Sequence, residues 1–191
     1  MSHLPTTQEM KTQPSLADIP RTRRVVTGHN EQGKSVIVED GPAPNMHRSE
    51  YSPNTAQVIW ATDEMPARCH NEPDPAPQSR RFKASPSPFG TILRIANFPP
   101  DSEYDAEKMK LFLREIGGHS NGSDRHFFFH KTPTLDYAIV LSGEIWALMD
   151  EGETLLKAGD VLIQRATNHS WSNRSSALCQ MAFVLIDAQP E

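Results

Sequence analysis

The sequence predicts an all-β domain of the sandwich or barrel type, and three observations support this fold class. From residue 126 onwards, short apolar runs alternate with turn signals at intervals of roughly eight to twelve residues, as in antiparallel β folds. Only one segment of the chain has clear helical periodicity. With 191 residues, the chain is long enough for one domain with a hydrophobic core. The turn signals are Ser142-Gly143, Asp150-Glu151-Gly152, Ala158-Gly159-Asp160 and Asn173-Arg174-Ser175.

Four further strands are expected before residue 126. Residues 24–26 and 34–38 are strand-like and flank a glycine-containing turn, which predicts a β-hairpin. Residues 57–61 and 91–98 are also strand-like. Between them, residues 62–90 are rich in Pro, Asp, Asn, Ser and Arg, and this composition predicts a long surface excursion without regular structure.

The predicted helix follows residue 100. Ser102 and Asp105 fit a capping box, in which their side chains satisfy the first free backbone N–H groups. Gly117 and Gly118 supply a stop signal at the other end. The apolar residues at helical spacing, expected to pack against the β domain, are Met109, Phe112, Leu113 and Ile116.

Charge and composition exclude two classes of partner. The net charge is −5 and the isoelectric point is about 5.9, so neither nucleic acid nor an anionic membrane is an expected partner. The first residues lack the apolar core of a signal peptide, and apolar runs such as residues 181–186 are too short to span a bilayer. These features predict a cytoplasmic protein that binds a small molecule.

The domain organisation is expected to be simple. Residues 1–18 are polar, proline-containing and aperiodic, which predicts a flexible N-terminal arm. Residues 19–191 then form one domain, with its core motifs within residues 126–187. The two cysteines do not suggest a disulfide framework, and Cys179 is expected as a buried thiol within a strand.

Two segments of the β region contain polar residues at an ordered spacing. The first begins at His130, continues through Asp136, and ends at Gly143. The second begins at Gly159 and includes His169 near its end. In this order and at this spacing, the two segments resemble the first and second motifs of the cupin family.

The resemblance implies a cupin double-stranded β-helix, or jelly-roll barrel, with one short helix and a long N-terminal extension. Cupins place two histidines, an acid and a third histidine around a divalent metal. Carried over to this chain, His130, Asp136 and His169 occupy three of those ligand positions, and the metal would be Fe, Mn, Zn or Ni. Thr132 stands where the second histidine is expected, and a hydroxyl is a poor ligand for such a metal.

Three hypotheses for this site follow. In the first, His130, Asp136 and His169 form a two-histidine, one-carboxylate metal site. In the second, His126 joins them from the same face of an early strand. In the third, no metal binds, His169 is the catalytic acid or base, and Arg165 anchors an anion and pairs with Asp136.

Residues near the motif histidines are expected to contact the substrate. Gln164 and Arg165 precede the His169 loop, and both can bind a carboxylate or phenolate. Tyr137 and Trp171 are expected in the pocket wall. The catalytic set predicted from the sequence is therefore His169, Arg165 and Asp136.

The resemblance leads to one functional hypothesis and two alternatives. We expect a cupin-type lyase, such as a decarboxylase or dehydratase, or an isomerase. Its substrate would be an oxygenated, carboxylated or polyketide-like molecule of a secondary-metabolic or degradative pathway. The alternatives are a non-haem iron dioxygenase and a metal-free, non-catalytic binding module, which Thr132 favours. The family resemblance further implies a homodimer in which the hairpin at residues 24–38 contacts the partner subunit.

Overall fold

The computed structural model describes residues 19, 21–69, 73–118 and 125–189, so the arm predicted at residues 1–18 lies outside the described residues. The elements, in chain order, are β1 (Arg23–His29), β2 (Ser35–Pro42), β3 (His47–Arg48), β4 (Thr55–Thr62), β5 (Thr91–Phe98), the 3₁₀ turn η2 (Asp101–Glu103), α1 (Ala106–Glu115), β6 (Thr134–Ser142), β7 (Glu144–Met149), β8 (Glu153–Lys157), β9 (Val161–Arg165), β10 (His169–Ser172) and β11 (Cys179–Asp187). The predicted all-β fold with one short α-helix is confirmed.

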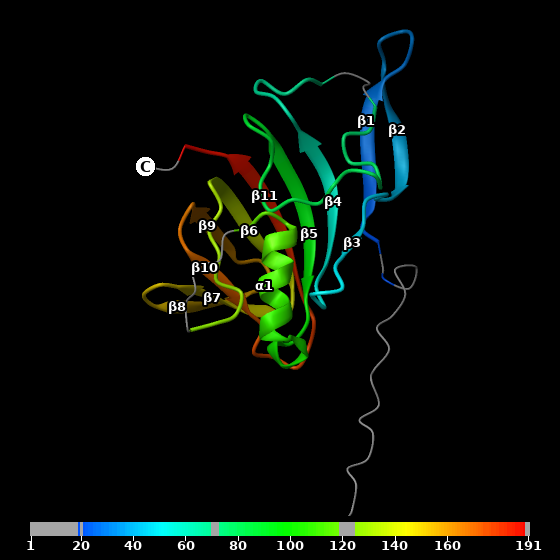
Figure 1. Cartoon of the computed structure of the whole chain (residues 1–191). Helices are drawn as coiled ribbons and strands as arrows, with labels where there is room; N and C mark the ends of the chain where they lie inside the picture. The colour runs from blue at the N-terminus through cyan, green and yellow to red at the C-terminus, as the bar shows by residue number, and fades with distance from the viewer. Residues whose placement is uncertain (1–18, 20, 70–72, 119–124, 190–191) are drawn as a thin grey trace, which may run out of the picture.

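The barrel is built from two sheets (Figure 1). The larger has six strands in the order β3-β4-β5-β11-β6-β9, and the smaller has three in the order β10-β7-β8. The last strand of the chain, β11, pairs antiparallel with both β5 and β6. This pairing places β5, which comes before the helix, on the same inner surface as the motif strand β6. Each turn predicted after residue 126 connects two successive strands.

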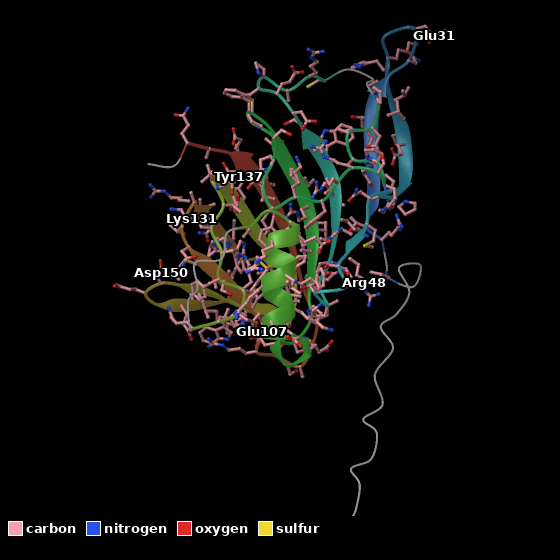
Figure 2. The ribbon with its side chains drawn as sticks, in the orientation of Figure 1. Glu31, Arg48, Glu107, Lys131, Tyr137 and Asp150 are labelled. Atoms are coloured by element: carbon pink, nitrogen blue, oxygen red, sulfur yellow. The ribbon has the colours of Figure 1, made fainter. Side chains whose placement is uncertain are left out.

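The predicted N-terminal hairpin is also confirmed, and β1 and β2 stand together beside β4 (Figure 1), with Glu31 in the connecting turn (Figure 2). Arg24 of β1, only 4% exposed, forms ion pairs with Glu39 at 2.6 Å and Asp74 at 2.7 Å. It also donates to the Ile59 carbonyl of β4 at 3.2 Å. Arg24 therefore connects the hairpin to the larger sheet. The exposed apolar residues of this hairpin are Val25, Ile37 and Val38.

The capping prediction for α1 is wrong in one detail. Ser102 lies within the preceding 3₁₀ turn, and Asp105 is the N-cap, whose carboxylate accepts from the backbone N–H groups of Glu107 and Lys108. Pro99 and Pro100 follow β5 and lead into this 3₁₀ turn, so the α-helix begins only after the turn. At the other end, Gly117 has a φ of 75° and the Gly118 N–H donates to the Leu113 carbonyl, as the glycine stop signal predicted.

Two further predictions concern burial. The buried face of α1 carries Met109, Phe112 and Leu113, which pack into the main core as predicted. The described part of residues 62–90 has no helix or strand after β4, also as predicted. Its assignment to the surface is wrong in part, because Phe82 and Ala84 are buried against the core.

Two further observations concern the state of the cysteines and the length of the helices. Cys179 is a buried free thiol, as predicted, and Cys69 is an exposed one. Within the described residues, the model contains no helix with both the length and the apolar character needed to cross a bilayer.

Candidate functional site

A cavity of about 80 Å³ lies inside the barrel and is lined from β4, β5, β6, β10, β11 and α1. Strand alternation decides which motif residues reach it. On β6, Asp136 faces the barrel interior, whereas its neighbour Tyr137 points outward and is 38% exposed. On β10, His169 and Trp171 share the inward face and both line the cavity.

The two motif histidines lie side by side in the wall of this cavity. His130 precedes β6 and pairs with His169, the first residue of β10, in an isolated antiparallel bridge. Their ring centroids are 4.4 Å apart, with an angle of 49° between the planes. The backbone bridge therefore fixes the relative position of the two imidazoles.

Both imidazoles are held neutral. Burial lowers the pKa of His130, and burial together with His130 lowers the pKa of His169 to about 3. The Nδ1 atom of His130 lies 2.8 Å from the Phe128 carbonyl, and that of His169 lies 3.0 Å from the Thr167 carbonyl. A carbonyl only accepts, so each Nδ1 carries the proton and each Nε2 is a hydrogen-bond acceptor.

Asp136 is the carboxylate of the cavity. It is 5% exposed, and burial raises its pKa to about 6, although Thr134 and Arg94 act in the opposite direction. Within the described residues its Oδ1 atom is buried and has no hydrogen-bond partner. Such a carboxyl group can both hold and release a proton near neutral pH.

Arg94 is the cation of the cavity, and sequence reasoning missed it. It lies on β5, and its Nη2 donates to the Lys83 carbonyl at 2.5 Å, while its Nε has no partner among the described residues. Burial lowers its pKa only to about 10, so it stays charged at neutral pH. The alternation of side chains along a strand could have identified it. Arg94, Ala96 and Phe98 are two residues apart in a correctly predicted strand, so their side chains point to the same face.

Register relates Arg94 to Asp136. Arg94 pairs with Phe183 of β11, while Asp136 pairs with Leu185 of the same strand. Their backbones are therefore two strands apart, about 10 Å in the direction across the sheet. The two charged side chains face one cavity without forming an ion pair of 4.0 Å or less.

The remaining lining is mainly apolar and aromatic. Trp171 contacts Phe183 edge to face, with ring centroids 5.5 Å apart. A ligand entering this cavity would therefore exchange water for contact with aromatic rings. The aromatic residues of the lining are Phe82, Phe98, Phe112, Phe128, Trp171 and Phe183.

The donor set does not fit the metal centre that the family resemblance implied. Thr132 is buried, and its hydroxyl lies 2.8 Å from the Thr134 hydroxyl. Among the described residues, no group of three or more His, Cys, Asp or Glu side chains is arranged to hold a metal ion. The set predicted from His130, Asp136 and His169 thus shares a cavity without forming a ligand group.

His126 does not complete that set. Its ring nitrogens face Ser170 Oγ at 2.6 Å and Asp101 Oδ2 at 3.4 Å, and it does not line the cavity. The chain around it is irregular, so the alternation assumed for an early strand does not apply. His126 instead connects the η2 turn to β10.

Three of the four predicted substrate contacts lie away from the cavity. Tyr137 faces outward from β6, as described above. Arg165, on the edge strand β9, is exposed and lines a separate open depression together with Lys131. Gln164 is buried opposite Asp136 but donates to the Thr167 carbonyl at 3.0 Å and does not line the cavity. Only Trp171 is in the cavity wall, and the arginine that lines the cavity is Arg94 rather than Arg165.

Comparison with known proteins places the chain in a family. No family model matches it. Phomopsin biosynthesis cluster protein C' of Diaporthe leptostromiformis is 32% identical over 172 residues, which cover 87% of this chain and 79% of that protein. The cupin-domain-containing oxidoreductase virC of Hypocrea virens is 26% identical over 178 residues, which cover 89% of this chain and 78% of that protein. The chain belongs to the cupin family.

Solved structures similar to this cupin include two bacterial proteins. A Cupin 2 conserved barrel domain protein from Salinispora arenicola matches with a TM-score of 0.34 and 18% identity, covering 58% of this chain and 72% of that one. A putative ethanolamine utilization protein Q from Salmonella typhimurium matches with a TM-score of 0.43 and 10% identity, covering 89% of this cupin and 99% of that chain.

Proposed function

We propose that this cupin is an enzyme that moves a proton on a small, oxygenated, largely apolar anion bound in the barrel cavity. One observation supports this proposal above all others. The same cavity contains a buried carboxyl group, Asp136, with a pKa of about 6 and a half-buried cation, Arg94. A pKa close to the working pH is the condition for efficient general acid–base catalysis.

The chemistry follows from the positions of these groups. Ionised Asp136 takes a proton from a carbon next to a carbonyl group, and Arg94 stabilises the negative charge that develops on the carbonyl oxygen. The Nε2 atoms of His130 and His169 accept hydrogen bonds from substrate hydroxyl groups. Return of the proton to another carbon is an isomerisation, and loss of a β-hydroxyl group, which leaves as water with the proton held by Asp136, is a dehydration. In a decarboxylation, the substrate carboxylate would instead leave as carbon dioxide, Arg94 would stabilise the resulting enolate, and protonated Asp136 would donate a proton to the carbon that lost the carboxylate.

The relatives support a biosynthetic setting for this activity. One is named a protein of the phomopsin biosynthesis cluster, and others are named cupin-domain-containing oxidoreductases. We place the present cupin in a secondary-metabolic pathway on this basis. The iron dioxygenase alternative depends on a three-ligand set that the described residues do not assemble.

Hydrogen–deuterium exchange tests the proposed activity without knowledge of the natural substrate. A panel of small carbonyl-containing acids is incubated with the protein in deuterium oxide, and proton NMR follows exchange at the carbon next to the carbonyl. We expect exchange with the native chain, at least a hundredfold slower exchange with Asp136→Asn, and native rates with Arg165→Gln. Equal rates for the native chain and Asp136→Asn would contradict the proposal.

Non-catalytic binding is the second candidate, and Thr132 favours it, because this residue removes a ligand from the usual cupin set. The same panel separates the two functions. A binding module would retain the acids, as measured by calorimetry, but would exchange none of their protons.

A further inference from the structure

We propose that Phe82 determines which substrates this cupin accepts, because its ring closes one side of the cavity and limits ligand length. The inference rests on the proposed function, in which the cavity binds a small anion. Phe82 is not in either cupin motif and comes from the irregular segment between β4 and β5. Among the described residues, it is the one that lines both the cavity and an outer cleft of about 400 Å³.

Two contacts with its aromatic ring hold Phe82 in place. On one face lies His47 of β3, with ring centroids 4.3 Å apart and an interplanar angle of 4°. Against the ring also lies the guanidinium of Arg94, 4.3 Å from the ring centroid. Rotation of Phe82 would break a stacked pair and a cation–π contact together.

The backbone on either side of Phe82 is also fixed. Before it, the Asn45 side chain donates to the carbonyls of Pro77 at 2.9 Å and Arg80 at 3.1 Å. After it, Arg94 donates to the Lys83 carbonyl, and the Ala84 N–H donates to the Ile116 carbonyl at 2.8 Å. The segment therefore behaves as a fixed wall, because withdrawing it would break these hydrogen bonds.

The size of the cavity and the charge of the outer cleft indicate how Phe82 would affect substrate specificity. The cavity of about 80 Å³ is small and Phe82 forms part of its wall, so a longer ligand meets the Phe82 ring. The outer cleft is lined by Arg80 and Arg81 with Glu115 as its one acid among the described residues. Shortening Phe82 would join the two spaces and admit longer anions.

Binding of two model anions of different length tests this role. Benzoate and 4-phenylbenzoate are titrated calorimetrically into the native chain, Phe82→Ala, Phe82→Leu and the control Phe89→Ala. Phe89 belongs to the same segment, is 70% exposed and lines neither space. We expect the native chain and Phe89→Ala to prefer benzoate, and both Phe82 variants to shift the affinity ratio at least tenfold towards 4-phenylbenzoate.

The outcomes separate this inference from the proposed function. Absence of benzoate binding to the native chain would contradict the proposed site and the role of Phe82 with it. Benzoate binding with the same length preference in Phe82→Leu as in the native chain would contradict the role of Phe82 alone. Phe82→Leu keeps an apolar side chain in the wall, so it provides the answer if Phe82→Ala does not fold.

Discussion

His130 and His169 exchange two backbone hydrogen bonds, of 2.9 and 3.0 Å, and the centroids of their imidazole rings lie 4.4 Å apart in the wall of the barrel cavity. A single bridge between two irregular or short segments thus aligns the histidines of both motifs. Both rings are neutral and both present an acceptor nitrogen. Thr132 stands where a further histidine is usual. Among the described residues, the two histidines therefore do not belong to a group of three or more side chains that could hold a metal ion.

Metal content should follow from this donor set. We expect native protein purified without an affinity tag to contain far less than one metal ion per chain. Thr132→His restores the usual cupin pattern and should bind zinc at close to one ion per chain. Mass spectrometry of the metals measures both. A stoichiometric metal in the native protein that is lost in His169→Ala would show that the donor set is larger than the described residues indicate.

Asp136→Asn should stabilise the protein in a pH-dependent way. Because the folded-state pKa of about 6 exceeds the ordinary value of 3.8, the folded chain binds this proton more tightly, so Asp136 lowers stability as pH rises from about 4 to about 6. The full effect is about 3 kcal/mol at neutral pH. Urea unfolding at several pH values measures it. The gain of Asp136→Asn over the native chain should grow with pH and level off above about pH 7; a pH-independent gain would contradict the shifted pKa.

Arg94→Gln should weaken anion binding in the cavity. Loss of a charge-assisted hydrogen bond costs about 1.5–3 kcal/mol, which corresponds to roughly tenfold to a hundredfold weaker benzoate binding. Arg165→Gln is the matched control, because Arg165 is exposed and outside the cavity. Calorimetry compares the two variants. A greater loss of benzoate affinity in Arg165→Gln than in Arg94→Gln would contradict this role of Arg94 and would support Arg165, the anion-binding residue predicted from the sequence.

The motif glycine Gly143 should be sensitive to substitution for two reasons. Its φ is 76°, and a Cβ there would lie 2.8 Å from the Leu178 carbonyl oxygen. Gly152 has a similar φ of 81° but open space around it, so it serves as the control. We expect Gly143→Ala to lose about 2–4 kcal/mol and Gly152→Ala about 1 kcal/mol in urea unfolding. Equal losses would show that the close contact adds nothing.

The sequence allowed most of the fold and the motif part of the cavity to be predicted. Turn residues at regular intervals indicated the strands after residue 126. Motif spacing identified His130, Asp136 and His169, which do share one cavity, and alternation explains why Trp171 joins them. The spacing did not reveal whether their donor atoms converge on one point, because that depends on the packing of side chains.

The remaining cavity residues depend on long-range contacts. Arg94 faces Asp136 only because β11 pairs with both β5 and β6, a pairing that no local pattern encodes. Phe82 lies in a segment without periodicity, where composition indicates exposure and only the contacts with His47 and Arg94 show burial. Arg165 was preferred as the anchor because it is close to His169 in sequence, but the edge strand points it to solvent.

The most direct test of this account is the titration of the Asp136 carboxyl group by carbon-13 NMR. Aspartate-labelled native protein is compared with Asp136→Asn to assign the resonance, and with Arg94→Gln to test the neighbouring cation. We predict a midpoint near pH 6 in the native chain and a higher midpoint in Arg94→Gln, because the cation favours ionisation. A native midpoint below about pH 4, the ordinary range of an aspartate, would contradict the assignment of Asp136 as the proton carrier.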